Sequence, residues 1–85
     1  METYTVYIIK NQENIYYKGY TTDISQRLEK HNSPLGKFTS ARGPWELVFK
    51  KLFESKAEAL KYESMLKRQN HRYLDWLIDS DKNQL

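Results

Sequence analysis

The fold of this chain is decided by residues 4–20, which read YTVYIIKNQENIYYKGY. The first seven residues, 4–10, are rich in β-branched and aromatic side chains, a composition typical of a strand. A polar turn at residues 11–14 follows, and residues 15–20 return to the strand pattern, which we expect Gly19 to end or kink. The stretch therefore predicts an antiparallel hairpin with a loop of more than two residues.

The rest of the chain adds helices and one further strand. The predicted elements are strands over residues 4–10, 15–20 and 46–53, and helices over residues 24–31, 55–68 and 70–78. Asp23 is one of three N-cap candidates for the first helix, and Ser55 with Glu58 forms a capping box for the second. The long connection at residues 32–45 is of a kind that is often functional in a compact domain.

This order of elements, β-β-α-β-α-α, predicts an α+β fold in which a small three-stranded antiparallel sheet is flanked by helices. The 85 residues leave room for one domain. We expect a single domain over residues 1–85, with its core at about 3–70 and a C-terminal helix at about 70–80.

Composition excludes several classes of function. The sequence has no cysteine, which excludes disulfides, thiolate zinc sites and cysteine nucleophiles and fits a cytoplasmic location. It has no run of about 18 apolar residues, so we expect no membrane partner. Fourteen Lys and Arg against eleven Asp and Glu give a net charge of +3. The positive charge is concentrated before residue 75, which favours a polyanionic partner.

Polar side chains occupy helix positions where the periodicity calls for apolar ones. In the first predicted helix, Ile24 and Leu28 define the buried face, and Arg27 and His31 fall beside them. Two potentially cationic groups beside a core are costly unless an anionic group meets them. The ordinary alternative is an arginine whose stem packs while its guanidinium reaches solvent, together with a surface histidine.

The helix over residues 55–68 also carries a charged side chain on its apolar face, in this case a carboxylate. Glu63 projects into the apolar sector of that helix, where a carboxylate needs a cation, a hydrogen-bond network or a metal. That sector comprises Ala59, Leu60, Tyr62 and Leu66. The alternatives are an internal ion pair between Glu63 and Arg27, or a pair with Lys67 at helical spacing.

The hairpin adds two hydroxyl groups. Tyr7 alternates away from Val6 and Ile8, and Tyr17 alternates away from Tyr16. Either tyrosine taken alone is explained by cross-strand packing. The candidate site that results from these misfits comprises Tyr7, Tyr17, Arg27, His31 and Glu63, with Lys67 as a further member.

In order and spacing, these residues resemble the GIY-YIG nuclease domain over about residues 3–70, and most closely its small, stand-alone bacterial branch. The resemblance is carried by Thr5-Val6-Tyr7, Tyr17-Lys18-Gly19, Arg27 and Glu63. It implies a three-stranded antiparallel sheet flanked by helices. It also implies hydrolysis of DNA phosphodiesters with one divalent ion, Mg²⁺ or Mn²⁺.

The resemblance assigns a role to each matching residue. Glu63 would be the protein ligand of the metal, and Arg27 would bind the scissile phosphate. Tyr7 and Tyr17 match the two motif tyrosines, one of which activates or positions the attacking water. His31 falls where other members place a histidine or tyrosine near that water, and which of these groups acts as the base stays open.

The sequence also departs from the family pattern. Thr5 replaces the first motif glycine, Lys18 replaces the central isoleucine of the second triplet, and Phe38 stands where this branch often carries a tyrosine. Because no domain that selects a DNA site is attached, we expect activity that is weak, structure-selective or lost.

The expected partner is nucleic acid, with DNA favoured over RNA, bound by a monomer. Expected backbone contacts are Lys37, Arg42, Lys67, Arg68 and Arg72. The alternative for these five residues is ordinary solvated surface. The rival function is a non-catalytic nucleic-acid-binding module of the same fold, and a third is a protein-interaction domain that uses exposed tyrosines.

Overall fold

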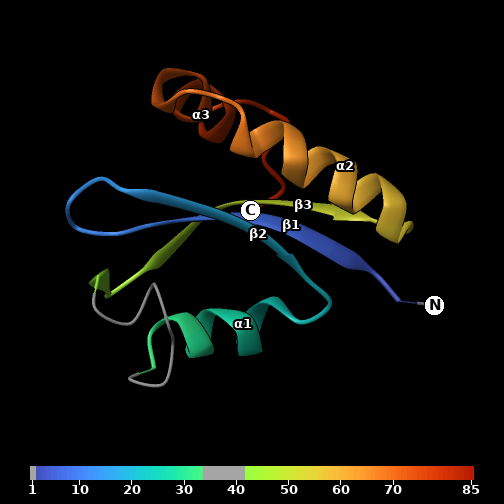
Figure 1. The fold of residues 1–85 in the computed structure, drawn as a ribbon, viewed down its shortest axis with the longest axis horizontal. Coiled ribbons are helices and arrows are strands. Elements are labelled where there is room, and N and C mark those ends of the chain that lie inside the picture. Colours follow the sequence, from blue (N-terminus) through green and yellow to red (C-terminus); the bar gives the residue numbers. More distant parts are fainter. Residues whose placement is uncertain (1, 34–41) are drawn as a thin grey trace.

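The computed structural model describes residues 2–33 and 42–85. Its elements are β1 (Tyr4–Lys10), β2 (Tyr16–Thr21), α1 (Ile24–His31), β3 (Glu46–Phe53), α2 (Lys56–Lys67) and α3 (His71–Ile78) (Figure 1). The predicted α+β fold and its order of elements are therefore confirmed, with most boundaries within one or two residues of those expected from the sequence.

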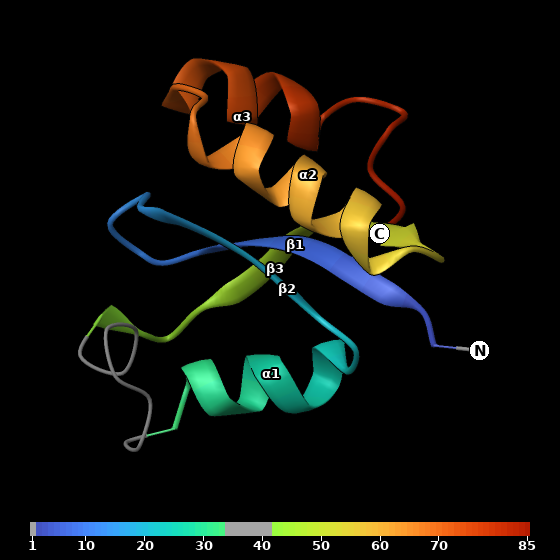
Figure 2. The same cartoon turned by 45° about the vertical axis from the view of Figure 1, so that its right-hand side comes forward.

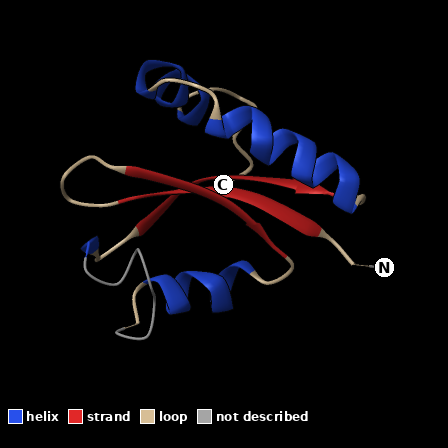
Figure 3. Ribbon diagram, in the orientation of Figure 1, coloured by secondary structure: helices blue, strands red, loops and turns tan. Residues whose placement is uncertain are grey.

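The three strands form one antiparallel sheet in the order β2-β1-β3, so that β1 lies in the centre. Helices α2 and α3 cover one face of this sheet and α1 covers the other (Figure 3). The turned view agrees with this three-layer arrangement (Figure 2). In the register of the hairpin, Tyr7 stands opposite Gly19 and Ile9 opposite Tyr17.

The central strand is buried on both faces, which explains why it is almost entirely β-branched and aromatic. Val6 and Ile8 belong to a core cluster with Phe49 and residues of α2 and α3. Tyr7 and Ile9 belong to a second cluster with Trp45, against which α1 packs. The predicted alternation of Tyr7 away from Val6 and Ile8 is thus confirmed.

Capping residues fix where the helices begin. The side chain of Asp23 accepts a hydrogen bond from the backbone N–H of Gln26 at 3.0 Å, and Ser55 accepts one from Glu58 at 3.3 Å. Each of these contacts satisfies a backbone donor that the first turn leaves without an intrahelical partner. The caps place Arg27 one turn into α1 and Glu63 in the second half of α2.

One predicted core residue of α2 lies at the surface. Ala59 and Leu66 are fully buried and Tyr62 is half-buried, whereas Leu60 is 37% exposed. The prediction of Leu60 as a core residue was wrong because the face of α2 that packs on the sheet is narrower than the apolar sector in the sequence.

The C-terminal residues occupy the outer edge of β3. Asn83 accepts a hydrogen bond from the Lys50 N–H at 3.3 Å and donates one to the Val48 carbonyl at 2.9 Å. Gln84 accepts one from the Leu52 N–H at 2.7 Å. These contacts satisfy backbone groups of an edge strand that would otherwise remain unpaired. Within residues 2–33 and 42–85, no helix has the length and apolar character needed to cross a membrane.

Candidate active site

Tyr7 and His31 form a hydrogen-bonded pair between the sheet and α1. The hydroxyl of Tyr7 lies 2.8 Å from Nε2 of His31, and the two rings meet edge to face. Both side chains are buried, with 1% of Tyr7 and 8% of His31 exposed. The alternative that His31 is a surface histidine is therefore wrong.

The direction of this hydrogen bond follows from the protonation of its partners. Burial raises the pKa of Tyr7 to about 12, so its phenol is protonated at neutral pH. Burial, aided by the charges of Arg27 and Lys30, lowers the pKa of His31, so its ring is neutral there. The Tyr7 hydroxyl consequently donates the hydrogen bond and Nε2 of His31 accepts it. The single ring proton of the neutral histidine is therefore on Nδ1.

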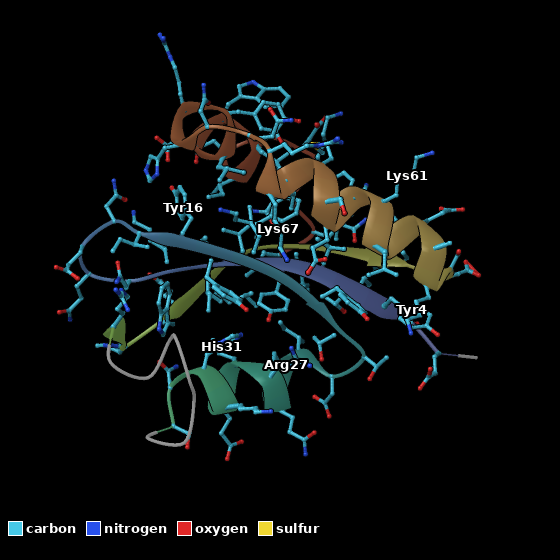
Figure 4. The ribbon with its side chains drawn as sticks, viewed as in Figure 1. Tyr4, Tyr16, Arg27, His31, Lys61 and Lys67 are labelled. Atoms are coloured by element: carbon cyan, nitrogen blue, oxygen red, sulfur yellow. The ribbon has the colours of Figure 1, made fainter. Side chains whose placement is uncertain are left out.

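Arg27 is the cation whose charge acts on both members of this pair, since it lowers the pKa of Tyr7 and that of His31. It is half-buried on α1, and its charge lowers the pKa of Tyr7, which opposes the effect of burial. Arg27 and His31 both project from α1 toward the sheet (Figure 4). A guanidinium beside a phenol stabilises the phenolate, so this arrangement makes the Tyr7 proton easier to remove than burial alone would allow.

Tyr17 completes the aromatic surroundings of His31. Its ring lies edge to face with His31, with 4.9 Å between the centroids, and also contacts Trp45 in the same way. His31 is thus placed between the two tyrosines singled out in the sequence. Such packing holds the imidazole in one orientation.

Gly19 makes the position of Tyr7 possible, a role that the sequence did not reveal. A Cβ atom at Gly19 would lie 2.6 Å from the Tyr7 hydroxyl oxygen and 2.8 Å from its ring carbon Cζ. Of the two expected effects of Gly19, to end or to kink the strand, the first is wrong because β2 runs through it to Thr21. Glycine is needed here since the tyrosine side chain crosses the neighbouring strand where any other residue would place its Cβ.

Glu63 approaches the site from the other layer. It belongs to α2, only 12% of its side chain is exposed, and its Oε2 lies 3.6 Å from Nζ of Lys67. Its charge contributes to raising the pKa of Tyr7, which places the carboxylate within electrostatic reach of the Tyr7 hydroxyl. Among the described residues, no ion pair joins Glu63 to Arg27, so of the two expected pairings the one with Lys67 is formed.

The carboxylate of Glu63 fits a hard divalent cation by its chemistry. Carboxylate oxygen is the ligand type that Mg²⁺ and Mn²⁺ prefer. In the part of the chain that is described, no three His, Cys, Asp or Glu side chains gather as a metal site. A metal at Glu63 would therefore keep several water ligands, as Mg²⁺ usually does, and would compete with the Lys67 ammonium for the carboxylate.

Lys67, the partner of Glu63, has a second lysine within electrostatic reach, Lys18 of β2. Lys67 points from α2 toward β2 (Figure 4). Burial and the charge of Lys67 lower the pKa of Lys18, the residue that replaces the motif isoleucine on β2. From the sequence Lys18 is a departure from the family pattern, and its proximity to Lys67 is a finding of the structure. The signal for it was strand alternation, which puts Lys18 and Ile8 on the face that α2 covers.

Of the other predicted nucleic-acid contacts, three fall among the described residues: Arg42, Arg68 and Arg72. Arg68 borders a surface groove with Phe53 and Met65, and Arg72 is exposed on α3. Arg42 is exposed, and its carbonyl oxygen accepts a hydrogen bond from Asn11 at 3.0 Å. Lys37 and Phe38 lie outside the described residues.

Comparisons with known proteins identify the family of the chain. The model of the GIY-YIG catalytic domain matches residues 3–75. A UPF0213 protein of Staphylococcus aureus (strain Mu3) is 43% identical over 68 residues, which cover 79% of this chain and 83% of that protein.

Two solution NMR structures share the fold. The UPF0213 protein BH0048 from Bacillus halodurans superimposes with a TM-score of 0.63 at 36% identity, covering 96% of this chain and 88% of that one. The protein EF2693 from E. faecalis gives a TM-score of 0.63 at 28% identity, covering 100% and 99%. The chain therefore belongs to the GIY-YIG domain family and, with the relative from Staphylococcus aureus, to the UPF0213 proteins.

Proposed function

We propose that this protein is a metal-dependent nuclease that hydrolyses phosphodiester bonds in DNA. The observation that carries the proposal is the buried hydrogen bond between Tyr7 and His31, with the guanidinium of Arg27 beside it and Glu63 within electrostatic reach. Membership of the GIY-YIG family supports a nuclease-type function. The proposal assigns proton acceptance to the Tyr7–His31 pair, phosphate binding to Arg27 and metal binding to Glu63.

The proton acceptor is the Tyr7–His31 pair. Because Tyr7 donates to Nε2 of a neutral His31, its proton can pass to the histidine while the phenolate oxygen accepts one from the attacking water. Arg27 stabilises the negative charge on the phenolate. Tyr17 holds the imidazole through its edge-to-face contact and belongs to the same site.

Arg27 and Glu63 act on the substrate side. A guanidinium presents two parallel N–H groups to a phosphate, so Arg27 is suited to bind the scissile group. Glu63 would hold the divalent ion in competition with Lys67, whose ammonium would then be available to a phosphate of the nucleic acid. A bound Mg²⁺ or Mn²⁺ ion supplies charge stabilisation at the phosphoryl oxygen and the leaving group.

The rival function is a non-catalytic nucleic-acid-binding module. The observation in its favour is the ion pair between Lys67 and Glu63, which already gives the largely buried carboxylate a cationic partner without a metal. In that case Glu63 would serve stability, and the basic residues would bind nucleic acid with no cleavage.

A cleavage assay separates the two functions. The wild-type protein, Glu63→Gln and the matched control Glu58→Gln are incubated with single-stranded, duplex and branched DNA in Mg²⁺, Mn²⁺ or EDTA. Glu58 lies on the same helix and is exposed. We expect metal-dependent cleavage by the wild type and the control, and a loss of at least about 100-fold in Glu63→Gln. A Glu63→Gln variant that cleaves as fast as the control would exclude Glu63 as the metal ligand.

A further inference from the structure

A polar cavity of about 510 Å³ opens beside Arg27, outside the cluster of Tyr7, His31 and Glu63. Its walls come from four separate segments of the chain. They are the N-terminal stretch with Glu2 and Tyr4, the end of β2 with Tyr20 and the following Thr22, Arg27 of α1, and Lys56 of α2. This volume is in the range of sites that hold small organic ligands.

The charges of the cavity suit an anion. Arg27 and Lys56 contribute two cations from different helices, and Glu2 contributes one carboxylate, which accepts a hydrogen bond from the Tyr4 hydroxyl at 3.2 Å. Lys56 is the first residue of α2, a helix of 12 residues, so the positive end of the helix dipole adds to its charge.

The cavity also offers groups that can contact a sugar or a base. Thr22 is exposed and carries a hydroxyl, and Tyr20 combines an aromatic ring with a phenol. Aromatic rings stack with nucleobases, and hydroxyl groups bind phosphate and sugar oxygens. The cavity therefore combines cationic groups that can bind a phosphate with an aromatic ring that can stack on a base, in a volume that suits a nucleotide.

We propose that this cavity holds the nucleotide next to the scissile phosphate, and that Lys56 binds the phosphate of that nucleotide. The inference rests on the proposed function, since Arg27 is shared between the two places: its guanidinium binds the scissile phosphate and its side chain forms one wall of the cavity. The nucleic acid strand then runs from the Tyr7–His31 pair past Arg27 to the first turn of α2. Lys56 acts in substrate binding and takes no part in the chemical step.

The test measures binding without cleavage. Glu63→Gln serves as the parent, and Lys56→Ala is compared with Lys61→Ala, an exposed lysine of the same helix that projects away from the sheet (Figure 4). The affinity for a fluorescein-labelled single-stranded oligodeoxynucleotide is measured by anisotropy over a range of salt concentrations. We expect Lys56→Ala to weaken binding several-fold and to reduce the slope of log affinity against log salt by about 0.7, the value for one phosphate contact on a single strand. Lys61→Ala should change neither quantity.

A second readout locates the contact. Thymidine 5′-monophosphate should shift the backbone amide signals of Thr22 and Lys56 in the wild type and not in Lys56→Ala. If Lys56→Ala binds the oligonucleotide like Lys61→Ala, while Arg27→Ala weakens binding, the cavity proposal is overturned and the proposed nuclease stands. If Lys56→Ala weakens binding but the wild type cleaves no DNA with any metal, the cavity belongs to a binding module and the nuclease fails. If no variant binds DNA at low salt, both are overturned.

Discussion

The substitution Gly19→Ala tests how the candidate site is built. In the register of the sheet Gly19 stands opposite Tyr7, and its φ angle is not positive. Alanine is therefore compatible with the backbone, and the effect of the substitution comes from its methyl group alone. That group would lie 2.6 Å from the Tyr7 hydroxyl oxygen and 2.8 Å from Cζ, well inside the 3.4 Å at which ordinary contact begins.

The expected cost follows from how little the tyrosine can move. Tyr7 is 1% exposed and its hydroxyl is bound to His31, so relief of the clash requires a shift of the strand or the loss of that hydrogen bond. Overpacking of this kind costs about 1–3 kcal/mol, and a lost hydrogen bond about 1 kcal/mol. The lower entropy of the unfolded alanine chain offsets about 0.4–1 kcal/mol. We expect a net loss of about 1–3 kcal/mol in the free energy of unfolding.

Urea denaturation measures this loss, and a double-mutant cycle assigns its cause. In Tyr7→Phe the nearest atom to the new methyl group is absent, so Gly19→Ala should cost about 1 kcal/mol less in that background than in the wild type. The ring resonances of His31 should shift in Gly19→Ala, because its partner hydroxyl is displaced. The reasoning is refuted if Gly19→Ala changes stability by less than about 0.5 kcal/mol and leaves those resonances in place.

Three further predictions concern pH, the ion pair and the chain end. The folded-state pKa of His31 lies below its unfolded value, so the unfolded state binds more protons and stability should fall as the pH drops from about 7.5 through 6.5 to the folded pKa. Urea midpoints should show this fall in the wild type and in His71→Gln but not in His31→Gln. Lys67→Met should bind Mn²⁺ up to about fivefold more tightly than the wild type, since no ammonium competes for Glu63. Its free energy of unfolding should change by less than about 1 kcal/mol. EPR of free Mn²⁺ measures the affinity, and an affinity equal to that of the wild type would contradict the competition. In urea denaturation, Asn83→Ala should lower the free energy of unfolding by about 2–3 kcal/mol, because the Asn83 side chain donates two hydrogen bonds to carbonyl groups and accepts one from a β3 amide. A loss below about 0.5 kcal/mol would show that the C-terminal residues do not stabilise that edge of the sheet.

Local patterns in the sequence predicted the elements and the faces of the site. Strand alternation separated Tyr7 from Val6 and Ile8, and helical periodicity turned Arg27 and His31 toward the sheet; both are confirmed. These signals work because the side-chain direction in a regular element repeats with a fixed period. The family resemblance gave the same residues from their order and spacing.

Features that depend on packing between distant segments were not predictable in this way. The requirement for glycine at position 19 arises from a tyrosine on another strand, and the contacts of Asn83 arise from a strand more than 30 residues away. The exposed hydrogen bond between Tyr16 of the hairpin and Asp75 of α3 is of the same kind. A periodic pattern carries no information about which partner an outward-facing group will meet.

The proposed function requires that Glu63 hold a divalent metal beside Tyr7 and Arg27. It is tested most directly by titrating the ¹⁵N-labelled protein with Mn²⁺, with and without thymidine 5′-monophosphate, and following paramagnetic broadening of the amide signals. The account predicts saturable broadening centred on Glu63 that extends to Tyr7 and Arg27, is reversed by excess Mg²⁺, persists in Glu58→Gln and is lost in Glu63→Gln. Broadening that is unchanged in Glu63→Gln, or that centres on the acidic C-terminal residues Asp79 and Asp81 in both conditions, would contradict it.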